Sequence, residues 1–214
     1  MDRDTTAENI SSALEQDTTS EDITQRFPIV AIGASAGGLK AIEEFFDCMP
    51  ADSGAAFVII QHLSPDFKSL MSELLERRTQ MEVRVATEGM PLVENAIFLI
   101  PPGQNMRLSE NALYLTPQER GSGRQPQFPI NLFFESSATE GKERIASIVL
   151  SGTGTDGTQG IQSVSEAGGI VLVQDPTTAE FDGMPRSAIA TGLADLVLPP
   201  RALANATYQW VTSP

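Results

Sequence analysis

The strongest constraint on the fold is a series of short, uninterrupted apolar runs that alternate with segments of helical periodicity. The first two runs are Phe27 to Ile32 and Ala55 to Ile60, and further runs lie near 145–150 and 170–174. A strand that is apolar at every position is typical of a parallel sheet covered on both faces, whereas a half-exposed strand alternates. The pattern predicts an α/β domain with a doubly wound, mostly parallel sheet and helices on both faces.

The predicted elements begin at Phe27. Strands are predicted near 27–33, 56–61, 95–100, 145–150, 170–174 and 195–198, and helices near 37–47, 67–78, 130–139, 157–167 and 199–211. Residues 105–115 place Ser109-Glu110-Asn111 between apolar stretches and predict a small antiparallel hairpin. Residues 117–129 are rich in Pro, Gly, Gln and Arg and are predicted to form a surface loop.

The first 26 residues differ in composition from the rest of the chain. They hold seven acidic and two basic residues among Ser and Thr, with few large apolar side chains. Such a segment buries too little apolar surface to order itself, so residues 1–26 are predicted to be a disordered acidic tail. The remainder, 27–214, suits a single domain with a substantial core.

Charge and composition argue against several classes of function. Fourteen Lys and Arg against 28 Asp and Glu give a formal charge of −14, which is unfavourable for nucleic acid. No apolar stretch approaches the ~18 residues of a membrane span, and residues 1–26 do not resemble a signal peptide. The single Cys48 precludes an intrachain disulfide and is interpreted as a small buried apolar side chain. We expect a cytoplasmic protein without membrane insertion, and the absence of Cys/His ligand spacing leads us to expect no metal or cofactor.

A serine and the only histidine each follow a strand-like run. Gly33-Ala34-Ser35-Ala36-Gly37 matches the G-x-S-x-G nucleophile elbow, in which small neighbours allow a strand-to-helix turn to expose a serine. His62 ends the next run, about one βαβ unit later. Because chemistry in open α/β sheets gathers at the carboxyl ends of the strands, the leading hypothesis is a serine hydrolase with Ser35 as nucleophile and His62 as base.

The acidic partner of the histidine is not determined by spacing. Asp156, Asp175 and Asp182 all lie at or beyond strand ends. Asp156 could instead cap the helix that begins near Gly157, and Asp175 could instead organise a turn before Pro176. These alternatives remain open at the level of the residues.

A dinucleotide-binding site is the main rival hypothesis. Gly152, Gly154 and Gly157 match G-x-G-x-x-G after a strand and before a helix, and Asp175 ends the following strand. However, the Asp156 carboxylate beside the helix N-terminus would occupy the positive field that should hold the pyrophosphate. We therefore expect no dinucleotide binding.

Several motifs occur in the order found in one family. They are IGASAGG at 32–38, QHL at 61–63, IPPG at 100–103, LSGTGTDG at 150–157, QDP at 174–176 and FDGMPRSA at 181–188. Over about residues 27 to 203 the chain resembles the catalytic domain of chemotaxis protein-glutamate methylesterases, and most of all the form fused to receptor methyltransferases. The resemblance implies a catalytic triad of Ser35, His62 and Asp156, which decides among the aspartates.

The resemblance also implies a reaction and its partners. A carboxylic ester hydrolase of this family demethylates glutamate methyl esters on the cytoplasmic helices of chemoreceptors, releases methanol and also deamidates receptor glutamines. A receptor methyltransferase domain is a further expected partner. Ala36 and Thr153 stand where many relatives have threonine and methionine, and with Arg186 they are the candidate oxyanion and substrate contacts. The alternative is a signalling interaction module that retains the triad without catalysis. We expect no phosphorylatable receiver domain within this chain.

Overall fold

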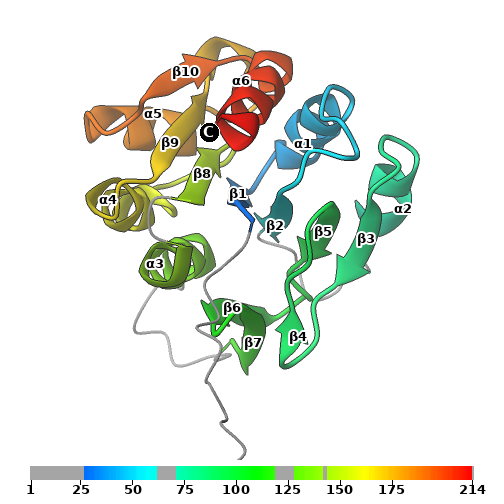
Figure 1. The fold of residues 1–214 in the computed structure, drawn as a ribbon. Helices are drawn as coiled ribbons and strands as arrows, with labels where there is room; N and C mark the ends of the chain where they lie inside the picture. The colour runs from blue at the N-terminus through cyan, green and yellow to red at the C-terminus, as the bar shows by residue number, and fades with distance from the viewer. Residues whose placement is uncertain (1–26, 62–70, 119–127, 142–143, 214) are drawn as a thin grey trace, which may run out of the picture.

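The computed structural model describes residues 27–61, 71–118, 128–141 and 144–213. In these ranges the chain forms a central parallel sheet between two layers of helices, with a small antiparallel sheet beside it (Figure 1). The central strands are β1 (Ile29–Ala34), β2 (Ala56–Gln61), β3 (Glu82–Val85), β5 (Ala96–Leu99), β8 (Ile145–Val149), β9 (Ile170–Gln174) and β10 (Leu196–Leu198). The predicted tail, 1–26, lies outside the described residues.

The order of the central strands is β10-β9-β8-β1-β2-β5-β3, and every pairing is parallel. The chain starts in the middle at β1, builds toward β3 on one side, and then returns to β8 on the other side. This reversal is the topological switch point of a doubly wound sheet, where ligands bind beyond the carboxyl ends of the strands. The predicted fold class is confirmed.

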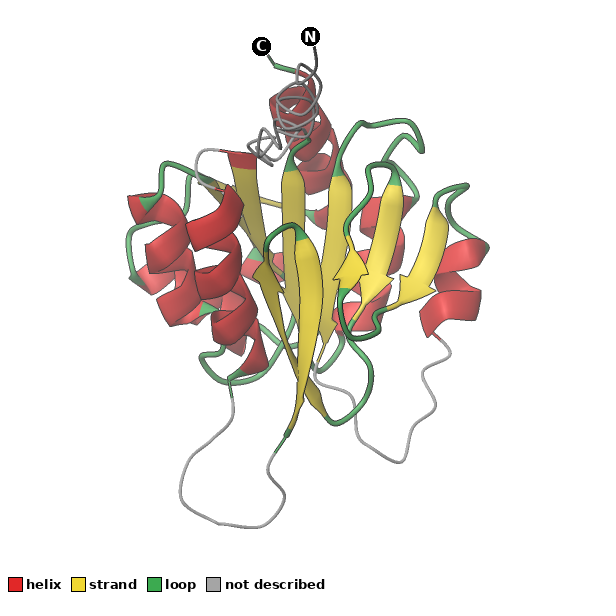
Figure 2. Ribbon diagram, turned by 60° about the horizontal axis from the view of Figure 1, so that its bottom comes forward, coloured by secondary structure: helices red, strands yellow, loops and turns green. Residues whose placement is uncertain are grey.

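The register aligns the ends of the three middle strands. Ala34 at the end of β1 pairs with Gln61 at the end of β2, and Gly33 pairs with Val149 at the end of β8. The loops that leave β1 and β8 therefore begin side by side at one edge of the sheet. Figure 2 shows the strands of the sheet flanked by helices.

Both faces of the sheet are buried because the strands are apolar on both sides. The helices α1 (Gly38–Phe46), α2 (Met71–Glu76) and α6 (Pro200–Thr212) pack against one face, and α3 (Pro129–Gly141), α4 (Thr158–Glu166) and α5 (Gly183–Ala190) pack against the other. Along β1, Ile29 and Ala31 point toward the α3 layer, whereas Val30 and Ile32 point toward the α1 layer. The uninterrupted apolar runs thus supply two separate cores.

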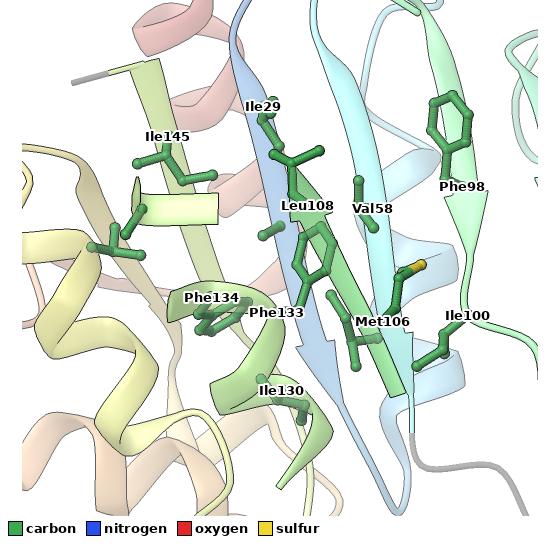
Figure 3. Close-up of a cluster of buried hydrophobic side chains, with 14 of the residues drawn as sticks. Ile29, Val58, Phe98, Ile100, Met106, Leu108, Ile130, Phe133, Phe134 and Ile145 are labelled. Atoms are coloured by element: carbon green, nitrogen blue, oxygen red, sulfur yellow. The ribbon is translucent and has the colours of Figure 1, made fainter. Parts of the chain in front are cut away.

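The antiparallel sheet extends the core on the α3 side. Its strands are β4 (Met90–Pro91), β6 (Gln104–Ser109) and β7 (Ala112–Pro117), in the order β4-β7-β6. The turn between β6 and β7 has positive φ at both Glu110 (49°) and Asn111 (58°), as a type I′ hairpin turn requires. Figure 3 shows Leu108 of this hairpin in the same buried cluster as Phe133 and Phe134 of α3. The predicted hairpin at 105–115 is confirmed.

All six predicted strands and all five predicted helices have counterparts within the described residues. The sequence pattern does not predict β3, whose charged Glu82 and Arg84 interrupt a four-residue edge strand. It also does not predict α5, because Gly183 and Pro185 lie in its first turn. Most of the predicted loop at 117–129 lies outside the described residues.

Candidate active site

Ser35 directly follows β1 and begins a tight turn into α1. The turn is closed by a hydrogen bond from the Gly38 N–H to the Ser35 carbonyl (3.0 Å), and Gly37 adopts the left-handed conformation with φ 70°. The Ser35 N–H donates to the carbonyl of Ser151, the residue that follows Leu150 after β8 (3.0 Å). The half-buried serine is therefore fixed to the neighbouring strand's loop through its own backbone.

The two glycines of the G-x-S-x-G pattern have different physical roles. Gly33 faces α3 so closely that a Cβ there would overlap the Cγ2 atom of Ile130. Gly37 combines its positive φ with a close neighbour, since a Cβ there would lie 2.7 Å from the Cβ of Glu180. The first glycine lets a helix approach the sheet, and the second allows the turn.

Asp156 is buried beside Ser35's strand, with only 3% of its surface exposed. Its carboxylate accepts hydrogen bonds from the backbone N–H groups of Ile130 (3.0 Å), Asn131 (2.9 Å) and Gly157 (2.8 Å). Two of these donors belong to the first turn of α3, whose positive dipole end favours a negative charge. The predicted alternative, a cap for the helix that begins near Gly157, names the wrong helix: Asp156 accepts from the first turn of α3, and the N-cap of α4, Gly157, has no side-chain cap hydrogen bond.

A side chain of α3 in turn caps the first turn of α4. The Asn131 side-chain oxygen accepts hydrogen bonds from the N–H groups of Gln159 and Gly160, both at 3.0 Å. Asp156, which precedes α4, caps α3, and Asn131, which lies in α3, caps α4. We call this pair of contacts the reciprocal cap; it fixes the carboxylate in position.

Ser151 and Gln174 connect three loops at the same edge, and sequence reasoning did not assign either residue. The buried Ser151 hydroxyl donates to the Ala36 carbonyl (2.9 Å) and accepts from the Phe181 N–H (3.0 Å). The Ser151 N–H donates to the side-chain oxygen of Gln174 at the end of β9 (2.8 Å). The signal that could have found them is a polar residue that ends an apolar run of the sequence, which recurs at Ser35, Ser151 and Gln174.

Asp175 and Asp182 have local roles. The Asp175 carboxylate accepts from both the N–H and the hydroxyl of Thr177 (2.8 Å each), and these hydrogen bonds lower the pKa of Asp175. Asp182 pairs with Arg186 one helical turn later (2.5 Å). Asp175 therefore organises a turn, as the alternative predicted, although this turn is the 3-10 helix η2 (Pro176–Thr178), which contains Pro176 and does not precede it. Of the three aspartates, Asp156 alone is buried.

His62, the predicted base, lies outside the described residues. Gln61, the last residue of β2, is described, and its side-chain N–H group donates to the Ser35 carbonyl (3.5 Å). Its Cα is paired with that of Ala34. The described part of the site thus contains Ser35 and Asp156 on loops from adjacent strands, and the role of His62 stays a prediction.

The candidate oxyanion and substrate contacts occupy different positions. The Ala36 carbonyl is used by Ser151, whereas Thr153 is exposed in the loop after β8. Arg186 is also exposed, with 67% of its side chain accessible, and forms the ion pair with Asp182 that was the alternative to a substrate contact. None of these arrangements tests an oxyanion or substrate role.

The glycine-rich loop after β8 is organised differently from a dinucleotide site. The Gly152 N–H donates to the Phe181 carbonyl (2.9 Å), and the Gly157 N–H donates to the Asp156 carboxylate. These N–H groups are already hydrogen-bonded within the protein, so they are not directed at a pyrophosphate. Among the described residues, no cluster of three or more His, Cys, Asp or Glu could hold a metal ion, and no helix is long and apolar enough to cross a membrane.

Fold and site together define a doubly wound α/β domain that presents a serine and a buried aspartate at its switch point. Residues 30–207 match the family model described as CheB methylesterase, and the chain belongs to this family. The crystal structure of the Thermotoga maritima CheB methylesterase catalytic domain superimposes with a TM-score of 0.77 at 25% identity, covering 86% of this chain and 99% of that chain.

Longer relatives share the same region. A protein-glutamate methylesterase/protein-glutamine glutaminase of Moorella thermoacetica is 34% identical over 188 residues, which is 86% of this chain and 44% of the relative. A second, from Methanosarcina mazei, is 32% identical over 179 residues, or 80% and 48%. A 104.1 kDa protein of Rhodobacter capsulatus is 47% identical over 128 residues, or 60% and 13%. The chain thus spans about half or less of these relatives.

Proposed function

We propose that this chain is a protein-glutamate methylesterase that hydrolyses γ-glutamyl methyl esters on the cytoplasmic helices of chemoreceptors and releases methanol. The observation that carries the proposal is the placement of Ser35 and the buried Asp156 on loops from adjacent strands, in a chain of the CheB methylesterase family. Relatives named as methylesterase/glutaminase support deamidation of receptor glutamines as a second reaction.

The proposed mechanism assigns one task to each member of the triad. Ser35 attacks the ester carbonyl while His62 removes the hydroxyl proton and then donates it to the leaving methanol. Asp156 orients the imidazole and stabilises the imidazolium. Water then attacks the acyl-enzyme with His62 again as base, which releases the glutamate carboxylate and restores Ser35.

The remaining assignments follow from the same proposal. The Ala36 N–H, next to the nucleophile, is a candidate oxyanion donor, and Thr153 and Arg186 are candidate substrate contacts. Chemoreceptor cytoplasmic helices are the proposed partner, together with a receptor methyltransferase domain. A cytoplasmic location follows from this substrate.

Methanol release from a methylated chemoreceptor fragment tests the proposal. We expect the wild-type chain to release methanol and Ser35→Ala to abolish nearly all of it, because the variant lacks the hydroxyl proposed to form the acyl-enzyme. The matched control is Ser109→Ala, which removes a half-buried serine from the antiparallel sheet. His62→Ala should be as severe, and the double variant should lose little more. A wild-type chain that binds the receptor fragment without releasing methanol would favour the non-catalytic module.

A further inference from the structure

An exposed aromatic side chain lies on the loop that covers the Ser35 turn. Phe181, between the 3-10 helix η2 (Pro176–Thr178) and α5, has 40% of its surface exposed. Its backbone is nevertheless fixed, since its N–H donates to the Ser151 hydroxyl (3.0 Å) and its carbonyl accepts from the Gly152 N–H (2.9 Å). The exposed aromatic ring thus stands on a backbone that is held by two hydrogen bonds.

Continuous contacts lead from Phe181 to the nucleophile. Gly152, which is bonded to the Phe181 carbonyl, approaches Ser35 so closely that a Cβ on Gly152 would lie 2.9 Å from the Ser35 Cβ. The neighbouring Glu180 lies against Gly37, the second glycine of the serine turn. The Phe181 backbone is therefore linked to Ser35 through a single residue, Gly152.

The position of Phe181 suits recognition of a protein substrate. This argument rests on the proposed function. A methyl ester on a folded receptor is a small group, so recognition of the receptor must come from contacts beside the ester. On a helix, the neighbours of the ester-bearing glutamate are the residues three and four positions away. An aromatic ring on a fixed backbone loses little entropy on binding, and such side chains dominate many interfaces.

We propose that Phe181 is a specificity-determining residue that packs against apolar side chains of the substrate helix, three or four residues from the methylated glutamate. Single exposed apolar residues are common and need no function. Phe181 differs because its loop is bonded to the same residues that hold the Ser35 backbone, so a helix docked on the ring is placed relative to the nucleophile. The occupant is an amphipathic receptor helix with its apolar stripe next to the ester.

Two synthetic helical peptides of equal length test this proposal with the full 214-residue chain. Each carries one γ-methyl glutamate; one has leucines three and four residues away, and the other has glutamines there. A short blocked γ-methyl glutamate serves as a substrate without a helix. We expect the wild type to prefer the leucine peptide in kcat/KM, and Phe181→Ala to lose about tenfold on that peptide alone. Tyr208→Ala, which removes a similarly exposed ring (36%) from α6, should retain the preference.

The outcomes separate this inference from the proposed function. An unchanged preference in Phe181→Ala would overturn the inference, and so would equal losses on both peptides and the short ester, which would indicate a role in positioning Ser35. A wild type that hydrolyses both peptides equally would also overturn it while leaving the esterase assignment intact. A wild type that hydrolyses none of the three esters would contradict the proposed function itself.

Discussion

At the scale of single residues, Asp156 combines a proposed catalytic role with a structural one. Its carboxylate is the acceptor for two N–H groups of α3 and one from its own loop, all buried. Substitution of Asp156 should therefore change two properties, the activity and the free energy of unfolding. Substitution of Ser35, which is held through its backbone, should change the activity alone.

Asp156→Ala should lower the free energy of unfolding by about 3 kcal/mol, because buried N–H groups lose a charged acceptor. Ser35→Ala should change it by less than about 0.5 kcal/mol. Urea denaturation followed by circular dichroism measures both. Equal stabilities for the two variants would contradict the capping role, and activity losses in Asp156 variants should be compared only below their melting temperatures.

The sequence identified Ser35 and Asp156 as candidates from polar residues after apolar strands, but it could not identify their contacts. Asp156 accepts a hydrogen bond from Ile130, in the first turn of a helix, 26 residues earlier in the chain. Such a contact depends on how α3 docks on the sheet, and spacing along the chain carries no information about docking. The same holds for the link between Ser151 and Phe181, which are 30 residues apart.

At the scale of elements, the approach of α3 to β1 positions the site. Gly33 leaves room for the side chain of Ile130 at the start of α3, and the backbone N–H groups of Ile130 and Asn131 in the same turn reach Asp156. The sequence predicted β1 and α3 correctly because both have strong apolar patterns. It missed β3 and α5 because an edge strand with charges and a helix with Gly and Pro in its first turn lack that signal.

Gly33→Ala should destabilise the protein by about 1–3 kcal/mol, since its Cβ overlaps Ile130. Ile130→Ala should also destabilise it, by removing buried methyl groups. The double variant should be more stable than the sum of the single losses predicts, because the smaller side chain makes room for the new Cβ. Thermal unfolding of the four proteins measures the coupling, and strict additivity would show that α3 does not meet Gly33.

The turn at η2 should contribute a pH-dependent stability. Hydrogen bonds from Thr177 lower the pKa of Asp175 in the folded protein below its unfolded value, about 3.9. The contribution is therefore present above that value and is lost as pH falls through the lower folded pKa. We expect the stability difference between wild type and Asp175→Asn to shrink below about pH 4. Urea titrations at pH 3 and pH 7 measure it; a constant difference would contradict the shift.

At the scale of the whole molecule, two cores on opposite faces of one sheet account for the stability of the described residues. One core lies under α1, α2 and α6, and the other lies under α3, α4, α5 and the hairpin. The family match, residues 30–207, falls within the same part of the chain. The domain boundary at residue 27 is a prediction from composition.

Deleting residues 1–26 should leave the melting temperature within about 2 °C of the full chain, because a highly charged segment has little apolar surface to bury. Methanol release per molecule should be unchanged as well. Differential scanning calorimetry on the two proteins is the measurement. A fall of about 10 °C would place the tail against the domain and overturn the predicted boundary.

The reciprocal cap also has a consequence for folding. Asn131 of α3 accepts from the first turn of α4, and Asp156, which precedes α4, accepts from the first turn of α3, so neither helix can complete its hydrogen bonds while the other is absent. The two helices should therefore open and close together, with matching amide hydrogen exchange rates in their first turns. A nascent chain that has formed only one of them lacks a fixed Asp156 carboxylate. Maturation of the proposed catalytic centre is then tied to the joint docking of these two helices.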